Sequence, residues 1–364
     1  MIKLRIAEYR KKHDLTQVAL AKRLGVSFQT ISKWENGKNY PDIEMLSDIS
    51  DVFGVSMEEL IGKKENNLSL EKQSSSKYWG KKIDYLLDTR KELWNDDYLE
   101  FLVEKVWKIR EAVSILDYGC GFGYLGMKLM PLLPEGSSYT GLDISKELIN
   151  EGKKGFQNSE FDTEFIQCDL YEYFPKQKYD IVISQALLRH SDRPETIMKK
   201  MYSSVKTNGL MICIDVNRIY EEAGYINSRL EYNPFDQLRV FEKLWSEELK
   251  NGGRDYSMGS KLASLMNNIG LKDIQSRMND KVIVATQLED FTSIKEAKGW
   301  NHKYDNESYH RIRTHFLQKG IPINEIDLYI DRLKNNLIDL NDPSYEGCIS
   351  FFRGMVITWG KNTE

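Results

Sequence analysis

The sequence predicts an all-α N-terminal domain of five helices, followed by an α/β domain with a mostly parallel sheet, an antiparallel last strand and helical C-terminal insertions. Three observations predict this division. Capping residues and terminating glycines recur through residues 1–60, strand and helix patterns alternate from residue 113, and a polar stretch separates the two regions. At 364 residues the chain is also too long for one ordinary domain.

The N-terminal helices are predicted at residues 2–13, 17–24, 28–35, 43–53 and 57–60. Thr16 and Ser27 stand where N-caps of the second and third helices belong, and Gly25 ends the second helix. The short turn Gly25-Val26-Ser27 between these two helices is typical of a helix-turn-helix arrangement.

The charge of this region changes sign along the chain. Residues 1–41 carry nine Lys or Arg and three Asp or Glu, whereas residues 42–60 carry six acids and no base. The whole chain has a net charge of −4. A basic segment at the start of an acidic protein favours a local site for a polyanion, although an ordinary solvated helix face would carry the same charge.

The pattern LTQxxLAxxLGVSxxTISxWENG between Leu15 and Gly37 closely resembles the phage-repressor-like, XRE-type helix-turn-helix family, over roughly residues 2–61. The resemblance implies that the third helix enters the major groove of double-stranded DNA and that the protein is a homodimer. Glutamine is a bidentate partner for adenine, and lysine reaches guanine or phosphate. The implied base-facing residues are Ser27, Phe28, Gln29, Ser32 and Lys33, and the implied phosphate contacts are Gln17, Asn36 and Lys38.

Residues 63–77 are polar and are predicted to form a flexible linker between a domain at 1–62 and a domain at 78–364. No apolar run approaches the ~20 residues of a membrane helix, and no secretory leader is recognised, so we expect no membrane partner. The four cysteines lie far apart and form no CxxC pair. We therefore expect no metal site and a reducing, cytoplasmic location.

Residues 78–110 are helical in pattern, and their many Trp and Tyr residues are typical of a core. The strands that follow are predicted at 114–118, 138–143, 163–168, 179–184 and 209–216, with helices at 125–132, 146–155 and 194–205. This alternation indicates a parallel sheet covered on both faces, whose ligands bind beyond the carboxyl ends of the strands.

Beyond the fifth strand, residues 218–249 and 291–340 are predicted to be helical, with a helix at 261–269 between them. Strands are expected at 273–285 and, antiparallel, at 355–359. We expect residues 217–255 and 287–345 to be helical insertions that cover the substrate pocket.

Three features gather at the carboxyl ends of the predicted strands. The turn Asp117-Tyr-Gly119-Cys-Gly121-Phe-Gly123 follows the first strand and allows a close backbone approach at a helix N-terminus. Asp143 ends the second strand, 22 residues after Gly121, where a carboxylate can accept hydrogen bonds from both ribose hydroxyls. Asp169 ends the third strand, where it can accept an adenine amino hydrogen or cap a loop.

Together these features resemble the class I S-adenosylmethionine-dependent methyltransferases, a Rossmann-like family, over roughly residues 78–286. The dinucleotide pattern GxGxxG fails, because Tyr124 stands three residues after Gly121. The resemblance implies S-adenosyl-L-methionine as cofactor and S-adenosyl-L-homocysteine as product. The implied cofactor-binding residues are Asp117, Gly119, Gly121, Gly123, Asp143, Ile144, Cys168, Asp169, Leu170 and Gln185.

His190 follows the fourth strand and is the candidate general base, although a histidine that only caps the next helix would fit the same position. Enzymes that methylate DNA amino groups carry Asn/Asp-Pro-Pro-aromatic at the end of this strand, and cytosine C5 enzymes need a Pro-Cys nucleophile. Here the strand ends in Ser184-Gln185-Ala186-Leu187, and no cysteine follows a proline.

The sequence therefore predicts a DNA-binding transcriptional regulator fused to a methyltransferase with a small-molecule methyl acceptor. Two other functions stay open: a sensor that binds the cofactor or a ligand without catalysis, and a DNA or protein methyltransferase.

Overall fold

The computed structural model describes residues 4–13, 15–53, 60, 86, 90, 93–231, 234–251, 253–287, 290–298, 300, 304–342 and 344–363. The linker at 63–77 and all but the last residue of the expected helix at 57–60 lie outside this range. The chain divides into two compact units. Unit 1 joins Met1–Glu71, Phe235–Glu247 and His302–Tyr345, and unit 2 joins Lys72–Pro234, Glu248–Asn301 and Glu346–Glu364.

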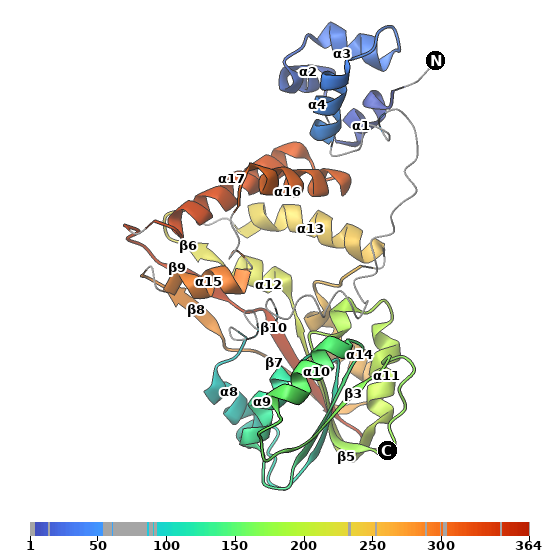
Figure 1. The fold of residues 1–364 in the computed structure, drawn as a ribbon, viewed down its shortest axis with the longest axis vertical. Coiled ribbons are helices and arrows are strands. Elements are labelled where there is room, and N and C mark those ends of the chain that lie inside the picture. The colour runs from blue at the N-terminus through green and yellow to red at the C-terminus, as the bar shows by residue number, and fades with distance from the viewer. Residues whose placement is uncertain are drawn as a thin grey trace. The chain divides into compact units, whose positions relative to one another are not determined.

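Unit 1 begins with four helices at the expected places (Figure 1): α1 (Ile6–Lys12), α2 (Gln17–Leu24), α3 (Phe28–Glu35) and α4 (Ile43–Phe53). The Thr16 side chain accepts the backbone N–H of Ala19, and the Ser27 side chain accepts that of Thr30. Gly25 ends α2 with a left-handed φ of 67°. The predicted caps are therefore confirmed, and the helices close over a core made by Ile6, Leu20, Ile31, Ile49 and Phe53 among others.

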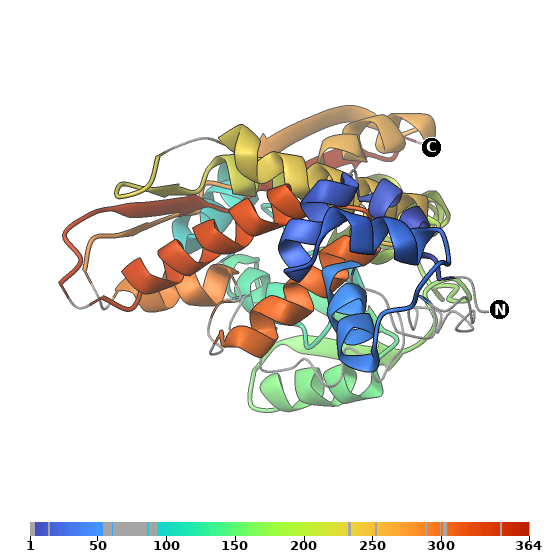
Figure 2. The same ribbon diagram turned by 90° about the horizontal axis from the view of Figure 1, so that it is seen from above.

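The rest of unit 1 is helical. It contains α13 (Pro234–Lys250), most of which belongs to this unit, and the neighbouring helices α16 (Asn306–Gln318) and α17 (Ile323–Asp339), drawn in orange and red in Figure 2. Val240, Phe316, Ile326 and Ile330 are buried among these helices, and Leu15 packs against the same cluster. Much of the sequence expected to cover the substrate pocket thus shares a unit with the helix-turn-helix. Its role as a substrate cap stays a prediction.

Unit 2 contains a seven-stranded sheet in the order β3-β2-β1-β4-β5-β10-β7. The strands are β1 (Ser114–Tyr118), β2 (Ser138–Asp143), β3 (Asp162–Gln167), β4 (Tyr179–Gln185), β5 (Val205–Val216), β7 (Lys272–Met278) and β10 (Met355–Lys361). The first five strands pair in parallel, while β10 is antiparallel to both β5 and β7. The predicted antiparallel last strand is confirmed, and it lies between two strands.

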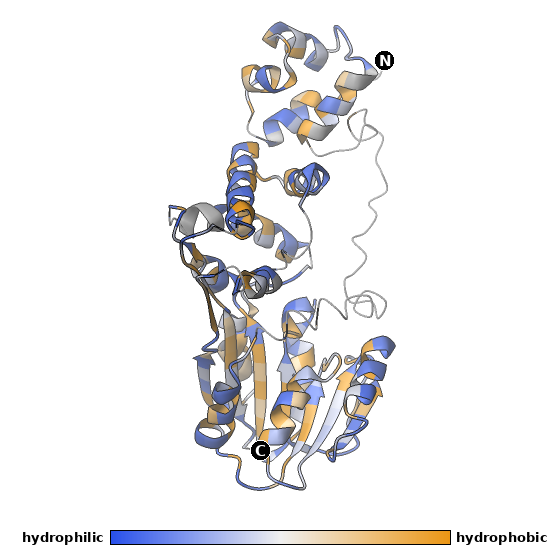
Figure 3. Cartoon of the chain, turned by 60° about the vertical axis from the view of Figure 1, so that its left-hand side comes forward, coloured by the Kyte–Doolittle hydropathy of each residue, from blue (hydrophilic) through white to orange (hydrophobic). Residues whose placement is uncertain are grey.

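Alternating side chains of this sheet face two helical layers, and several of its strands show orange, hydrophobic stretches in Figure 3. One face packs on α9 (Tyr124–Leu129), α10 (Lys146–Gly155) and the segment made of α8 (Asp96–Phe101) and a π-helix at Leu102–Val106. The other face packs on α11 (Pro194–Ser203) and α14 (Met258–Asn268). Ile115 and Leu116, neighbours on β1, lie in these two different cores. This doubly covered sheet is the predicted Rossmann-like architecture.

Two parts of the fold differ from the prediction. The strand expected at 273–285 is two strands, because β8 (Val282–Ala285) leaves the large sheet and pairs with β9 (Ile349–Phe352). The helical stretch expected at 218–249 is divided by β6 (Ile226–Asn227), which pairs with the other edge of β9. Helices α12 (Arg218–Ala223) and α15 (Phe291–Lys298) complete the unit. Among the described residues no helix is long and apolar enough to cross a membrane.

Candidate functional site

Glycine stands at each of the three positions after β1 for a different structural reason. All three have positive φ angles, 71° at Gly119, 58° at Gly121 and 79° at Gly123. A Cβ at Gly119 would lie 2.7 Å from Leu187 Cδ1, and one at Gly123 would lie 2.8 Å from Phe165 Cζ. A Cβ at Gly121 would meet no atom within 4 Å. Gly121 therefore borders open space, whereas Gly123 begins α9 and allows it to pack on the aromatic core.

Asp143 holds this turn in place from the end of β2. Its Oδ2 accepts the backbone N–H of Gly121 at 2.9 Å, and its Oδ1 accepts that of Ser145 at 2.8 Å. Burial raises the pKa of Asp143, and the backbone N–H groups oppose that rise. The carboxylate thus fixes the glycine turn to the start of α10 and retains lone pairs for further donors.

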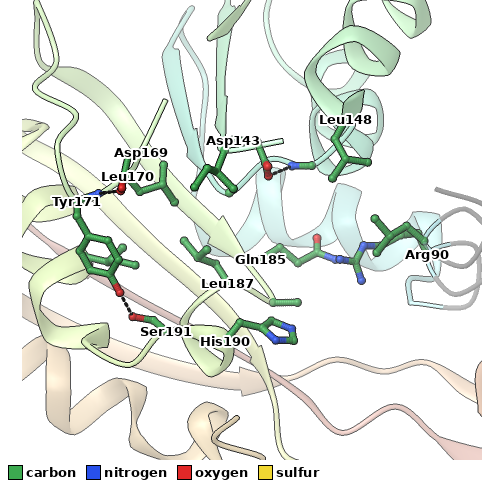
Figure 4. Close-up of a pocket in the computed structure, with 16 residues that line it drawn as sticks. Arg90, Asp143, Leu148, Asp169, Leu170, Tyr171, Gln185, Leu187, His190 and Ser191 are labelled. Atoms are coloured by element: carbon green, nitrogen blue, oxygen red, sulfur yellow. Dashed lines mark hydrogen bonds between the residues drawn. The ribbon is translucent and has the colours of Figure 1, made fainter. Parts of the chain in front are cut away.

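A cavity opens at this edge of the sheet (Figure 4). The space between its walls, with the solvent at its open mouth included, is about 830 Å³. A smaller cavity shares several of its residues and adds Asp117. Of the residues predicted from sequence, the two cavities bring together Asp117, Gly119, Gly121, Asp143, Ile144, Asp169, Leu170, Gln185 and His190.

Two predicted cofactor residues, Gly123 and Cys168, do not line either cavity. Gly123 lies against Phe165, and the half-buried Cys168 packs at the edge of the core that contains α11. Sequence reasoning missed several lining residues, which are Leu86, Arg90, Leu148, Tyr171, Ala186, Leu187, Ser191 and Ile197. Ala186 has a positive φ of 54°, which strains the backbone at this point of the cavity wall. No pattern in the sequence reveals that angle.

Unpartnered polar atoms face this region. Asp117 is 2% exposed, and its Oδ2 accepts the Tyr139 hydroxyl at 2.8 Å. Among the described residues its Oδ1 has no hydrogen-bond partner, and neither has the Gln185 amide oxygen or nitrogen. Burial raises the pKa of Asp117 to about 7. Buried polar atoms without partners are costly, so these two residues fit a site that a polar ligand completes.

His190 lies in the 3-10 turn Leu188–His190 after β4 and lines the cavity. Burial lowers its pKa well below 6.5, and the neighbouring Arg189 lowers it further. The imidazole is therefore neutral near pH 7 and able to accept a proton, although it is a weaker base than an exposed histidine. Figure 4 shows Arg90 and Gln185 extending toward one another across the cavity, with His190 nearby.

In the helix-turn-helix, the predicted base-facing residues lie on the outer side of α3. Ser27, Phe28, Gln29 and Lys33 are exposed and Ser32 is half-buried. The predicted phosphate contacts Asn36 and Lys38 are exposed as well.

Two of the predicted phosphate contacts already have protein partners. The Gln17 amide donates to Glu35 Oε2 at 2.8 Å, and Glu35 also pairs with Arg10. The Asn36 amide donates to the carbonyl oxygen of Ser32. Their phosphate roles stay predictions.

The comparisons with known proteins agree with this geometry. Residues 6–60 match a family model described as helix-turn-helix, and residues 109–269 match one described as a methyltransferase domain. The chain joins a helix-turn-helix domain to a methyltransferase domain.

Two curated proteins and one solved structure are similar to parts of this chain. Ubiquinone biosynthesis O-methyltransferase of Rickettsia typhi is 26% identical over 43% of this chain and 62% of that protein. Malonyl-acyl-carrier protein O-methyltransferase of Acetivibrio thermocellus is 32% identical over 28% of this chain and 35% of that protein. The structure of a cyclopropane synthase of Mycobacterium tuberculosis covers 81% of this chain and all of its own at 11% identity, with a TM-score of 0.45. The chain thus matches less than two thirds of the length of these curated relatives.

Gly121→Ala tests whether the glycine turn borders the ligand site. The added methyl group enters open space beside the cavity, and the positive φ strains the backbone by roughly 1–2 kcal/mol. Gly136→Ala is the matched control, because its φ is 86° and its Cβ meets only Ala112 at 3.5 Å, outside both cavities. Both variants are expected to lower the melting temperature by a few degrees. Only Gly121→Ala is expected to weaken S-adenosyl-L-homocysteine binding in calorimetry, and equal binding by the two variants would place the ligand elsewhere.

Proposed function

We propose that this protein is a DNA-binding transcriptional regulator whose second domain transfers a methyl group from S-adenosyl-L-methionine to a small molecule. The observation that carries the proposal is the fixed glycine turn. The Asp143 carboxylate accepts a hydrogen bond from the Gly121 N–H at the carboxyl ends of the strands. Beside it, buried polar atoms of Asp117 and Gln185 have no hydrogen-bond partner among the described residues.

The residues present fit this cofactor. Asp143 would accept hydrogen bonds from the ribose hydroxyls, because a carboxylate can accept several donors at once. Ile144 and Leu170 offer apolar surface for the adenine, and Asp169 offers an acceptor for its amino group. Gln185 and Arg90 stand near the glycine turn, where they would hold the amino acid end. Gly123 and Cys168 do not line the cavity, so they would support the cofactor-binding residues indirectly, through the packing behind the cavity wall.

The bound cofactor would supply a methyl group on a positively charged sulfur. The protein's task is to align the acceptor, exclude water and remove a proton where the acceptor carries one. His190 is placed for that last task, because it lines the cavity and is neutral at pH 7. The apolar side chains of Leu86, Leu148 and Leu187 limit water in the same cavity.

His190→Gln is expected to lower kcat by roughly 100-fold, in the range for loss of a general base. Its affinity for S-adenosyl-L-homocysteine is expected to stay within about twofold. Steady-state kinetics and calorimetry on the same preparation measure the two quantities. His310→Gln, on α16 of unit 1, is the control substitution. An unchanged kcat in His190→Gln would show that His190 only shapes the loop.

We propose that the helix-turn-helix reads double-stranded DNA through α3, and that two copies of the chain bind together. The double variant Gln29→Ala and Lys33→Ala removes two exposed side chains of that helix. Each base contact contributes about 1–3 kcal/mol, so the affinity for a selected operator is expected to fall at least 10-fold. Gel-shift titration with a fragment selected from genomic DNA measures this. The control pair, Lys153→Ala and Gln157→Ala, lies in unit 2, and an equal loss there would contradict the assignment.

A small-molecule acceptor fits better than DNA. The end of β4 presents Gln185, Ala186 and Leu187 to the cavity, without the Asn/Asp-Pro-Pro-aromatic sequence of enzymes that methylate DNA amino groups. Both curated relatives described above are named as O-methyltransferases.

The test is to incubate the full chain with cofactor labelled in the methyl group, a metabolite extract and operator DNA. Label in a small molecule supports the proposal. Label in DNA would overturn it in favour of a DNA methyltransferase. Absence of any labelled product, together with operator binding that depends on the cofactor, would instead establish a sensor.

A further inference from the structure

A group of cationic side chains lies beside the cavity, at the edge of the sheet formed by the ends of β4 and β5 and the start of β10. Arg189 follows β4, Arg218 begins α12 after β5, and Arg353 precedes β10. Arg254 lies in the segment before α14. We call these four arginines the arginine cluster.

Backbone hydrogen bonds hold these segments together. The Arg189 N–H donates to Asp215 Oδ2 at 3.1 Å, and the Asp255 N–H donates to the Arg189 carbonyl at 2.9 Å. The Arg218 N–H donates to the Tyr256 carbonyl at 2.9 Å. The segments that carry three of the arginines are therefore fixed beside one another, next to His190.

Arg189 is the central member. Its residue is 6% exposed, and its guanidinium lies over the ring of Tyr256, 5.3 Å from the centroid. Among the described residues its Nε has no hydrogen-bond partner. The nearby carboxylate of Asp215 accepts the backbone N–H groups of Arg189 and Val216. A buried guanidinium without an ion pair is costly unless an anion completes the site.

Two further acids nearby already have cationic partners. Glu221 pairs with both Arg218 and Arg353, and Asp255 pairs with Lys261 at 2.6 Å. The acids Asp215, Glu221 and Asp255 therefore face five cations, the four arginines and Lys261. Burial lowers the pKa of Arg189 to about 10, with Arg218 adding to the effect. Although complete burial by itself raises the pKa of a carboxyl group, the surrounding cations hold that of Glu221 below its usual value.

We propose that the arginine cluster, with Arg189 at its centre, binds an anionic group of the methyl acceptor, either a carboxylate or a phosphate. A guanidinium presents paired N–H donors that match both kinds of group. His190, the next residue along the chain, lines the cavity together with the glycine turn, so an acceptor anchored on Arg189 would have its reacting group close to His190. This inference rests on the proposed function, since it names the class of acceptor for the same site.

The experiment is calorimetry on the full chain saturated with S-adenosyl-L-homocysteine, titrated with benzoate, phenyl phosphate and the neutral benzyl alcohol. At least one anion is expected to bind 10-fold or more tightly than benzyl alcohol, which corresponds to about 1.4 kcal/mol. The tighter of the two anions tells a carboxylate acceptor from a phosphate acceptor. Arg189→Gln is expected to remove this preference, whereas Arg110→Gln, an exposed arginine outside the cluster, is expected to retain it.

Two results would overturn the inference: equal affinity for the anions and benzyl alcohol in the unaltered protein, or an unchanged anion preference in Arg189→Gln. Affinity for S-adenosyl-L-homocysteine is measured on every variant. If Arg189→Gln loses that affinity, Arg254→Gln is tested in its place, and it too is expected to lose the anion preference. Failure of the unaltered protein to bind S-adenosyl-L-homocysteine would be a failure of the proposed function. Failure of the anion preference alone would leave that function standing.

Discussion

Asp143→Asn is expected to weaken S-adenosyl-L-homocysteine binding by roughly 100-fold, or about 2.7 kcal/mol. Both carboxylate oxygens accept a backbone N–H, one from Gly121 and one from Ser145. An amide has only one oxygen, so its NH2 group would face one of these donors. The variant therefore loses charge-assisted hydrogen bonds to the ligand, each worth about 1.5–3 kcal/mol, and also displaces the glycine turn.

Calorimetric titration with S-adenosyl-L-homocysteine measures this loss. Asp162→Asn is the matched control, because Asp162 is exposed at the start of β3, at the amino ends of the parallel strands, whereas Asp143 lies at their carboxyl ends. Circular dichroism confirms that both variants are folded. Affinity within threefold of the unaltered protein in Asp143→Asn would mean that Asp143 only supports the turn and that the ribose binds elsewhere.

The local signals of the sequence predicted most of the fold. Thr16, Ser27 and Gly25 act over three or four residues, so the bounds of α2 and α3 follow directly from them. The small sheet was missed for the opposite reason. β6 has only two residues, and its partner β9 lies more than 120 residues further along the chain, so no local pattern reveals the pairing.

The residues of the candidate site show the same contrast between local signals, which the sequence reveals, and long-range contacts, which it does not. Gly119, Asp143 and Gln185 could be predicted because each stands at or directly after the end of a strand, and parallel strands bring their carboxyl ends to one edge. Leu86 and Arg90 precede the first strand and reach the cavity only through the tertiary fold. Arg189 could be singled out from the sequence as a possible contact for an acidic substrate group, because it directly follows β4. Its grouping with Arg218, Arg254 and Arg353 could not, because the four arginines come from separate segments between residues 189 and 353.

Glu221→Gln is expected to lower the free energy of unfolding of unit 2 by about 3–5 kcal/mol, the usual effect of removing one partner from a buried ion pair. Glu221 is fully buried, and its carboxylate pairs with Arg218 and Arg353. A glutamine fills the same space but removes the negative charge that pairs with both guanidinium groups. Urea unfolding followed by fluorescence and circular dichroism measures the change. Glu151→Gln, which alters an exposed pair with Lys154 in the same unit, is the control and is expected to change stability by less than about 0.5 kcal/mol.

The pH dependence of this difference separates charge from packing. The surrounding cations lower the pKa of Glu221 in the folded protein. Its contribution is therefore fully present above the unfolded pKa of about 4.3, and is lost as the pH falls through the lower folded value. The stability gap between the unaltered protein and Glu221→Gln is expected to be constant from pH 7 to pH 5 and to narrow below pH ~4. A gap that stays constant at every pH would mean that the loss comes from packing, and that the arginines do not depend on the Glu221 charge.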